Sequence, residues 1–260
     1  MKLARRLMMT ERFNEEDYSS VVLSDSPYAY WRLNESSGSV AKDLSGNARD
    51  GLYVNSVLLS SQSMLPSSPS KYLYLPANNS YDSNVPIDPP YVDISSANNF
   101  CSGESWSIEC WVAPATYGSP SGADYFYPGN YGGRLIGNRT YMGGSDRSNG
   151  LDFGVFGSPS GVYCWVGDGR QSSHYSYPPI GELCHIVFTY SPIGCALYFN
   201  GELVDSFGPM TNITIQPVLE IGTQGWTCGE FNGVIGEFAL YSADLSESRV
   251  LAHYSSGIGG

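Results

Sequence analysis

The dipeptide Asn200-Gly201 limits the possible folds of this chain more than any other short segment. Asn-Gly is the preferred pair for a type I′ turn, in which both residues take positive φ and the flanking strands pair antiparallel. Residues 196–199 and 202–207 flank the pair, so the sequence predicts a tight β-hairpin. Just before it, residues 185–190 are nearly all apolar, which predicts a central strand buried on both faces.

Short strand-like segments also fill most of the chain on either side of this hairpin. In residues 105–112, apolar and polar side chains alternate, as in a strand with one face toward a core. The 30 glycines and 16 prolines supply the many turns that such strands need. A Ser246 N-cap followed by residues 249–254 predicts one short C-terminal helix instead. The other predicted strands are residues 28–33, 52–59, 71–75, 134–137, 151–156, 162–166 and 233–241.

The charge of the chain argues against several classes of partner. The formal net charge is −12 and the basic residues are scattered, whereas nucleic acids and anionic membranes both require clustered Lys and Arg. We therefore expect neither partner. No apolar run reaches the length of a transmembrane helix. Residues 1–12 carry charges but no apolar core segment, so we expect no secretion signal and no export by the usual route.

The chain divides into two regions by composition. Residues 1–20 combine clustered charges with no alternating pattern and are predicted to be an N-terminal arm. Residues 21–260 are predicted to be one β-sandwich domain, for which this length is ordinary. The segment is either a frayed arm or a short helix. An arm either docks on a partner chain or is a disordered terminus, and the sequence leaves these alternatives open.

Six cysteines are present, and none forms a Cys-x-x-Cys pair. Cys110 and Cys184 lie inside apolar strand-like segments, so we expect reduced thiols that act as small core residues. Disulfides are the alternative, although no export signal supports them. With only three histidines and unsuitable spacings, a zinc site is not expected.

Several motifs occur in the order typical of a known family. Residues 30–35 (YWRLNE) precede the turn at residues 43–47 (DLSGN) and then Gly51, and residues 105–111 (SWSIECW), the hairpin and residues 233–246 follow. This order resembles laminin-G-like domains of the concanavalin A-like lectin/glucanase superfamily. The resemblance implies an all-β fold, a jelly-roll sandwich of two antiparallel sheets, which the strand alternation independently supports. In one departure, Cys184 stands where the family usually has Trp before His.

The resemblance also implies a structural calcium ion. In such domains a calcium often ties the first turn to the last strand, and the matching positions are Asp43, Asn47 and Glu237. Calcium takes six to eight oxygen ligands from carboxylates, amides and carbonyls. The family often has an acidic pair where this chain has Gly236-Glu237, and Gly236 interrupts it. A purely structural turn is the alternative, because Asp, Asn and Gly also stabilise turns without a metal.

We expect no catalytic activity. The glucanases of the superfamily use a Glu-x-Asp-x-Glu strand, in which carboxylates on one face attack and protonate the glycosidic bond. No such run occurs here, and His174, His185 and His253 stand in no recognisable nucleophile motif.

Long aromatic connections are the expected binding surface. Tyrosine and tryptophan rings stack on the apolar faces of sugars, but they are also enriched at protein interfaces, and the sequence does not decide between these roles. Loops of this length are usually functional. The candidate ligand-binding residues are Tyr125, Tyr127, Tyr131, Tyr141, Tyr175, Tyr177 and Trp226.

A lectin-like sandwich without an export signal, with thiols expected to be reduced, fits a component of a virus particle. Residues 18–31 also look like the start of laminin-G-like modules in bacteriophage structural proteins. We therefore expect a virion subunit, a capsid decoration or tail-associated protein made in the host cytoplasm. Its expected partners are other virion proteins, further copies of itself and a host surface glycan. The alternatives are a free carbohydrate-binding lectin domain of a bacterial or extracellular protein, and a glycan hydrolase without the usual motif.

Overall fold

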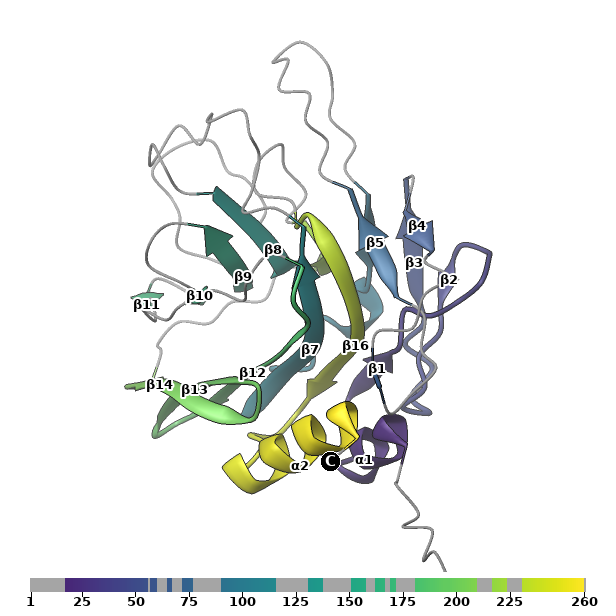
Figure 1. Cartoon of the computed structure of the whole chain (residues 1–260). Helices are drawn as coiled ribbons and strands as arrows, with labels where there is room; N and C mark the ends of the chain where they lie inside the picture. The colour runs from purple at the N-terminus through teal and green to yellow at the C-terminus, as the bar shows by residue number, and fades with distance from the viewer. Residues whose placement is uncertain are drawn as a thin grey trace, which may run out of the picture.

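The computed structural model describes most of the sandwich and omits several connections. The described residues are 17–55, 57–59, 65–66, 72–76, 90–115, 131–137, 151–157, 162–166, 169–171, 181–209, 217–223 and 231–259. They form two antiparallel sheets packed face to face, with two helices at one end (Figure 1). The predicted all-β sandwich is therefore confirmed.

The first sheet, sheet A, is built around its central strands β7 and β16. The strand β1 pairs with β16 beside the main order of strands. In spatial order the strands are β14 (Glu202–Phe207), β13 (Gly194–Phe199), β12 (Cys184–Ser191), β7 (Trp106–Pro114), β16 (Gly233–Tyr241), β5 (Leu73–Leu75) and β4 (Leu58–Leu59), with β1 at Ala29–Trp31.

The second sheet, sheet B, has the two-residue strand β15 near its centre. In spatial order the strands are β11 (Gly169–Gln171), β10 (Val162–Val166), β9 (Leu151–Gly157), β8 (Tyr131–Gly137), β15 (Glu220–Ile221), β6 (Tyr91–Asp93), β3 (Gly51–Val54) and β2 (Val40–Ala41). A short 3₁₀ turn, η1 (Ser95–Ala97), follows β6.

The central strands of sheet A are buried on both of their faces. Trp106, Ile108 and Cys110 of β7 enter the core between the sheets, as the alternation in the sequence predicts. Trp111 of the same strand belongs to a second apolar cluster, on the outer face of sheet A, together with Tyr18. Because both faces of these strands are covered, β7 and β12 are buried along nearly their whole length.

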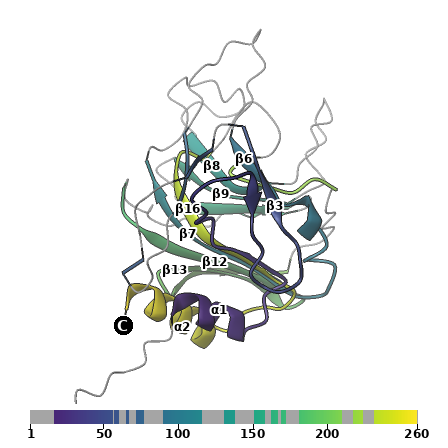
Figure 2. The ribbon, with the colours of Figure 1, turned by 90° about the vertical axis from the view of Figure 1, so that its right-hand side faces the viewer.

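Helices α1 (Tyr18–Ser24) and α2 (Glu247–Ile258) cover this outer face, side by side below β12 and β13 (Figure 2). Ser246 caps α2 by accepting a hydrogen bond from the backbone N–H of Arg249, which confirms the predicted N-cap. Helix α1 crosses residue 20, the expected end of the N-terminal arm, and buries Tyr18 completely. Neither helix has the length and apolar composition needed to cross a membrane.

The predicted hairpin is confirmed at its turn. Asn200 and Gly201 have φ values of 51° and 82°, the positive values of a type I′ turn, and they join β13 to β14. Cys184 and Cys195 beside it are free thiols in the core, as is Cys110.

One predicted strand is wrong. Residues 52–59 were expected to be continuous, but the chain turns at Asn55, whose φ is 61°. The first half is β3 of sheet B and the second half is β4 of sheet A. A positive φ ends a strand and lets the chain cross from one sheet to the other, and alternation alone does not reveal such a switch.

Candidate functional site

The aromatic candidates lie mostly outside the described residues. Tyr131 opens β8, where it pairs with Gly157 of β9. The other candidates, all outside the described residues, are Tyr125, Tyr127, Tyr141, Tyr175, Tyr177 and Trp226.

The Asp43 turn lies beside the first strand, and its carboxyl is occupied by protein donors. Asp43 Oδ1 accepts from the backbone N–H groups of Tyr30 at 3.0 Å and Ser45 at 2.9 Å. Oδ2 accepts from the Ser45 hydroxyl at 2.9 Å and from the backbone N–H of Arg49 at 2.8 Å. Four donors match the lone-pair sites of one carboxylate. Asn47 closes the turn by donating its side-chain N–H to the backbone oxygens of Pro27 and Tyr28.

Glu237 lies on a bulge of β16 and is fully buried. Its φ of 50° departs from strand geometry, and the bulge aims its carboxyl at the first strand. Oε2 accepts from the Tyr30 hydroxyl, and Oε1 accepts from Arg32 Nε at 3.2 Å and Nη2 at 3.1 Å. Tyr30 therefore bonds to Asp43 with its backbone and to Glu237 with its ring hydroxyl.

This arrangement does not fit a calcium ion shared by Asp43, Asn47 and Glu237. The carboxylate oxygens of Asp43 and Glu237 already accept hydrogen bonds from protein donors, and Arg32 supplies the positive charge beside Glu237. Packing also explains why residue 236 is a glycine. A Cβ at this position would lie 2.0 Å from Tyr72 Cδ1, so the family's acidic side chain has no room. The first and last strands are joined by Tyr30 and Arg32.

A second polar network, which the sequence did not reveal, lies beneath the helices. At its centre is Glu109 of β7, with a fully buried side chain. Its carboxyl accepts from Tyr18 at 2.7 Å and from Tyr241 at 2.6 Å. His185 Nε2 lies 2.7 Å from Oε1, and His253 Nδ1 lies 2.9 Å from Oε2. Glu109 was visible in the sequence only as a polar residue on one face of an alternating strand.

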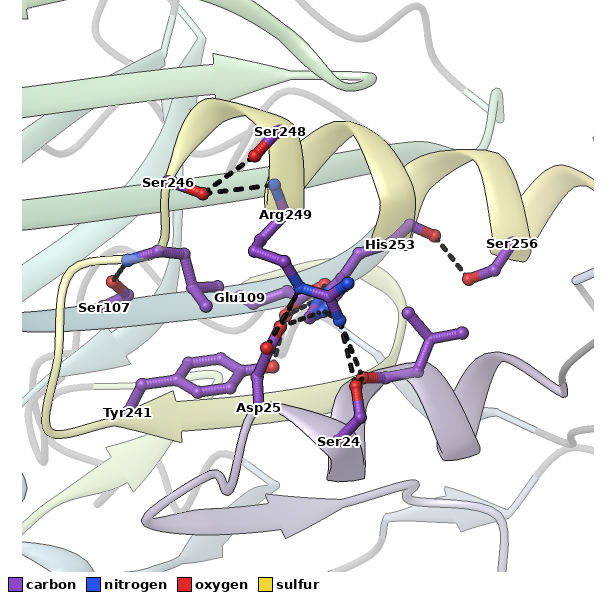
Figure 3. A network of polar contacts seen from close by, with 12 residues as sticks. Ser24, Asp25, Ser107, Glu109, Tyr241, Ser246, Ser248, Arg249, His253 and Ser256 are labelled. Carbon is purple, nitrogen blue, oxygen red and sulfur yellow. Dashed lines mark hydrogen bonds and ion pairs between the residues drawn. The ribbon is translucent and has the colours of Figure 1, made fainter.

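The network continues from His253 toward helix α1. His253 Nε2 lies 2.7 Å from Asp25 Oδ2, and Arg249 Nε lies 2.7 Å from the same oxygen. Arg249 also donates to the Ser24 hydroxyl at 3.0 Å. Figure 3 shows Arg249 and His253 pointing from α2 toward Asp25, while Glu109 comes from the sheet. Glu109 and Asp25 together balance His253 and Arg249 in charge.

The contacts of the two histidines lead to different assignments of their protonation states. Both nitrogens of His253 face carboxylates, and we therefore assign a doubly protonated imidazolium to this ring. Burial lowers the pKa of His253, but the charge of Glu109 and hydrogen bonds to Glu109 and Asp25 outweigh burial and raise it. Burial lowers the pKa of His185, and its Nδ1 has no partner among the described residues, so His185 is neutral and donates from Nε2.

Glu109 is ionised because the same contacts stabilise its charge. Burial by itself raises the pKa of Glu109, but the His253 charge and hydrogen bonds from both histidines hold it well below the usual range. The side chains of Glu109, His185 and His253 have no exposed surface. The network joins α1, α2 and sheet A, and a substrate cannot reach these three side chains in this arrangement.

Sequence and structure comparisons identify the family of this sandwich. A family model described as the concanavalin A-like lectin/glucanases superfamily matches residues 89–251, more than half of the chain. The chain belongs to this superfamily. In a search of curated protein sequences, none matches this chain.

Several solved structures share the fold of this superfamily member at low identity. One is domain 4 of AbnA, an extracellular arabinanase from Geobacillus stearothermophilus, and this structure of the domain is in complex with arabinotriose. Its sequence is 15% identical to this chain, and the TM-score is 0.61. The match covers 88% of this chain and 98% of that domain. The binding domain of botulinum neurotoxin DC, in complex with rat synaptotagmin II, is 16% identical with a TM-score of 0.60. The match covers 90% of this chain and 52% of the toxin's binding domain, so this chain corresponds to about half of that domain.

Proposed function

We propose that this chain is a non-catalytic lectin-like module that binds a glycan and serves as a structural subunit of a bacteriophage particle. The glycan-binding part rests above all on one observation. The chain matches nearly the whole of an arabinanase domain that is in complex with arabinotriose, and it belongs to a superfamily of lectins and glucanases. A structure of type C botulinum neurotoxin, which is 17% identical with a TM-score of 0.59, concerns the interaction of that toxin with two ganglioside molecules. This similarity also supports glycan binding.

The burial of the acidic and imidazole groups supports the non-catalytic part of the proposal. General acid–base chemistry needs a carboxyl or imidazole within reach of a substrate proton. Glu109, His185 and His253 are brought together, but they are fully buried and bound to one another. Their role is to hold the helices on sheet A. Any turnover of a polysaccharide by the purified chain would contradict this part.

The aromatic residues Tyr125 and Tyr175 offer a direct test of glycan binding. We expect the full chain to bind at least one glycan on an array of defined oligosaccharides and host polysaccharides. Replacing Tyr125 or Tyr175 by Ala should weaken binding because each change removes a stacking ring. Tyr74→Phe keeps the ring and serves as a control. Full binding by both alanine variants would remove these tyrosines from the site.

The virion part is supported by the likeness of residues 18–31 to phage structural modules, and it predicts association with intact particles. Purified particles should contain the chain, and deletion of residues 1–16 should release it. The deletion stops at residue 16 because Tyr18 is buried and bonds to Glu109. Absence from particles would contradict this part.

A free carbohydrate-binding domain is the alternative, and one observation favours it. The arabinanase whose domain 4 shares this fold is extracellular. This alternative predicts the same glycan binding, but with the chain present outside particles and unaffected by the deletion.

A further inference from the structure

Helix α2 contacts different elements on its two flanks. On one flank His253 reaches Asp25 at the end of α1. On the other flank Tyr254 and Leu251 lie against the hairpin turn, because a Cβ added at Gly201 would be 2.9 Å from Tyr254 Cδ1 and 3.2 Å from Leu251 Cδ1. Helix α2 therefore lies between α1 and the β13–β14 hairpin.

Exposed apolar side chains gather on the hairpin flank of α2. Leu251 is 50% exposed, and Ile258, about two helical turns further along, is 43% exposed. Leu203 of β14 is 46% exposed and pairs with Tyr198, which belongs to the apolar cluster on the outer face of sheet A. Single exposed apolar residues are ordinary, whereas a group of them marks a contact surface. Leu203, Leu251, Tyr254 and Ile258 are called the flank patch below.

Acidic side chains surround the flank patch. Glu202 directly precedes Leu203 and is exposed. Asp244 and Glu247, at the start of α2, are also exposed and lie close to Tyr198, because burial and the charges of Glu247 and Asp244 raise the pKa of its hydroxyl. None of the three acidic residues forms an ion pair with another described residue. A segment that covers this patch should therefore combine apolar side chains with positive charge.

Residues 1–16, the N-terminal segment, lie outside the described residues, and their sequence has this combination. Residues 2–9 (KLARRLMM) contain three basic side chains and four large apolar ones. The acidic residues of the segment come later, at positions 11, 15 and 16. Leu3 and Leu7 are four positions apart, a spacing that places two side chains on the same face of a helix.

The N-terminal segment begins its path close to the flank patch of its own chain. It leads into Tyr18, the first residue of α1, and two ring contacts of 5.9 Å each connect Tyr18 through Trp111 to Tyr254. Residues 10–16 span up to roughly 23 Å at about 3.3 Å per residue, which exceeds the diameter of a helix, about 10 Å. The covalent link also keeps the segment at a high effective concentration, which favours it over a segment of another molecule.

We propose that residues 2–9 of the free chain bind the flank patch, with the leucines of the segment against Leu203 and Leu251 and its basic side chains toward the acidic residues around the patch. The inference does not depend on the proposed glycan binding or virion role. It does affect assembly, because a segment bound to its own chain is not available to another protein. On a particle, the N-terminal segment would have to leave the patch before binding a neighbour.

Amide hydrogen exchange of the full chain, read by mass spectrometry of its N-terminal peptides, tests this docking. Residues 2–9 should exchange about tenfold or more slowly in the wild type than in Leu251→Ser or Leu203→Ser, because each change removes an apolar contact of the patch. Leu52→Ser is the matched control, since Leu52 is 51% exposed but lies on β3 of sheet B, and it should leave the protection unchanged. The two patch variants lie on different elements, so either one decides the question if the other fails to fold.

Ionic strength and charge reversal test the acidic surroundings of the patch. Added sodium chloride should speed the exchange of residues 2–9, because salt screens attraction between exposed charges. Glu247→Lys should also speed it. Adding Arg5→Glu and Arg6→Glu to Glu247→Lys should restore part of the protection, whereas a purely structural effect of Glu247→Lys would not be reversed by changes in the N-terminal segment.

Three results would overturn the inference. In the first, residues 2–9 show no protection in the wild type. In the second, Leu251→Ser and Leu203→Ser both keep the wild-type protection, so the segment binds elsewhere. In the third, protection grows with protein concentration and light scattering detects oligomers, so the patch is occupied by the N-terminal segment of a second copy.

Discussion

Glu109 on β7 and His253 on α2 form a fully buried ion pair, with 2.9 Å between Oε2 and Nδ1 across 144 positions of sequence. The pair joins a central strand of sheet A to the helix that covers its outer face. The same carboxyl binds Tyr18 of α1, so one residue anchors both helices. Buried charges of this kind are retained only when their partners are all present.

Replacing Glu109 by Gln is therefore expected to be strongly destabilising. The change leaves the His253 imidazolium with one carboxylate fewer in a buried site, and breaking such a pair costs about 3–5 kcal/mol. Urea denaturation gives the free energy of unfolding. Glu202→Gln on the exposed edge strand β14 is the control and should stay within about 0.5 kcal/mol of the wild type. Equal stability of the two variants would contradict a central role for Glu109.

The raised pKa of His253 predicts a pH dependence of stability. Its folded-state pKa lies above the ordinary 6.5, so its contribution is complete below pH 6.5 and is lost as pH rises through the folded value. The depressed pKa of Glu109 acts in the opposite range, because its contribution is lost only well below pH 4.5. In urea titrations, the wild type should be more stable than His253→Gln at pH 6, and the difference should shrink toward pH 9. A difference that grows with pH would refute the imidazolium assignment.

Calcium is expected to have no effect on stability, because Tyr30, Arg32, Ser45 and Arg49 already bind the candidate carboxyls. The thermal midpoint should be the same in excess calcium chloride and in excess EDTA. Tyr30→Phe should lower stability by about 1–3 kcal/mol, because it removes a donor to the buried Glu237. A calcium-dependent rise in the midpoint would restore the calcium site that the family resemblance implies.

Restoring an acidic side chain at residue 236 is expected to harm the fold. A Cβ there would lie 2.0 Å from the Tyr72 ring, so Gly236→Asp must displace that ring at a cost of about 1–3 kcal/mol or more. Gly208→Ala is a suitable control, because nothing lies within 4 Å of the Cβ it would add. Thermal denaturation of both variants measures the effect, and a stabilised Gly236→Asp variant would show that the Tyr72 contact does not restrict this position.

Local signals in the sequence determined the individual elements. The Asn200-Gly201 pair requires positive φ at two consecutive residues and so specified its hairpin. Ser246 specified the start of α2, and alternation in residues 105–112 placed Trp106, Ile108 and Cys110 in the core. Each of these signals depends on only a few neighbouring residues, so each can be recognised without knowledge of the rest of the chain.

The tertiary structure alone decided which groups meet. Glu109 gave no sign of its partners, because Tyr18, His185, Tyr241 and His253 are between 76 and 144 positions away in sequence. Glu220 and Asp93 become neighbours only because β15 pairs with β6. Strand order and register follow from the joint packing of both sheets, and a one-residue shift would move every side chain to the opposite face. The sequence by itself therefore determined the strands, the turn and the helix cap, whereas packing across the sheets brought the chemical groups together.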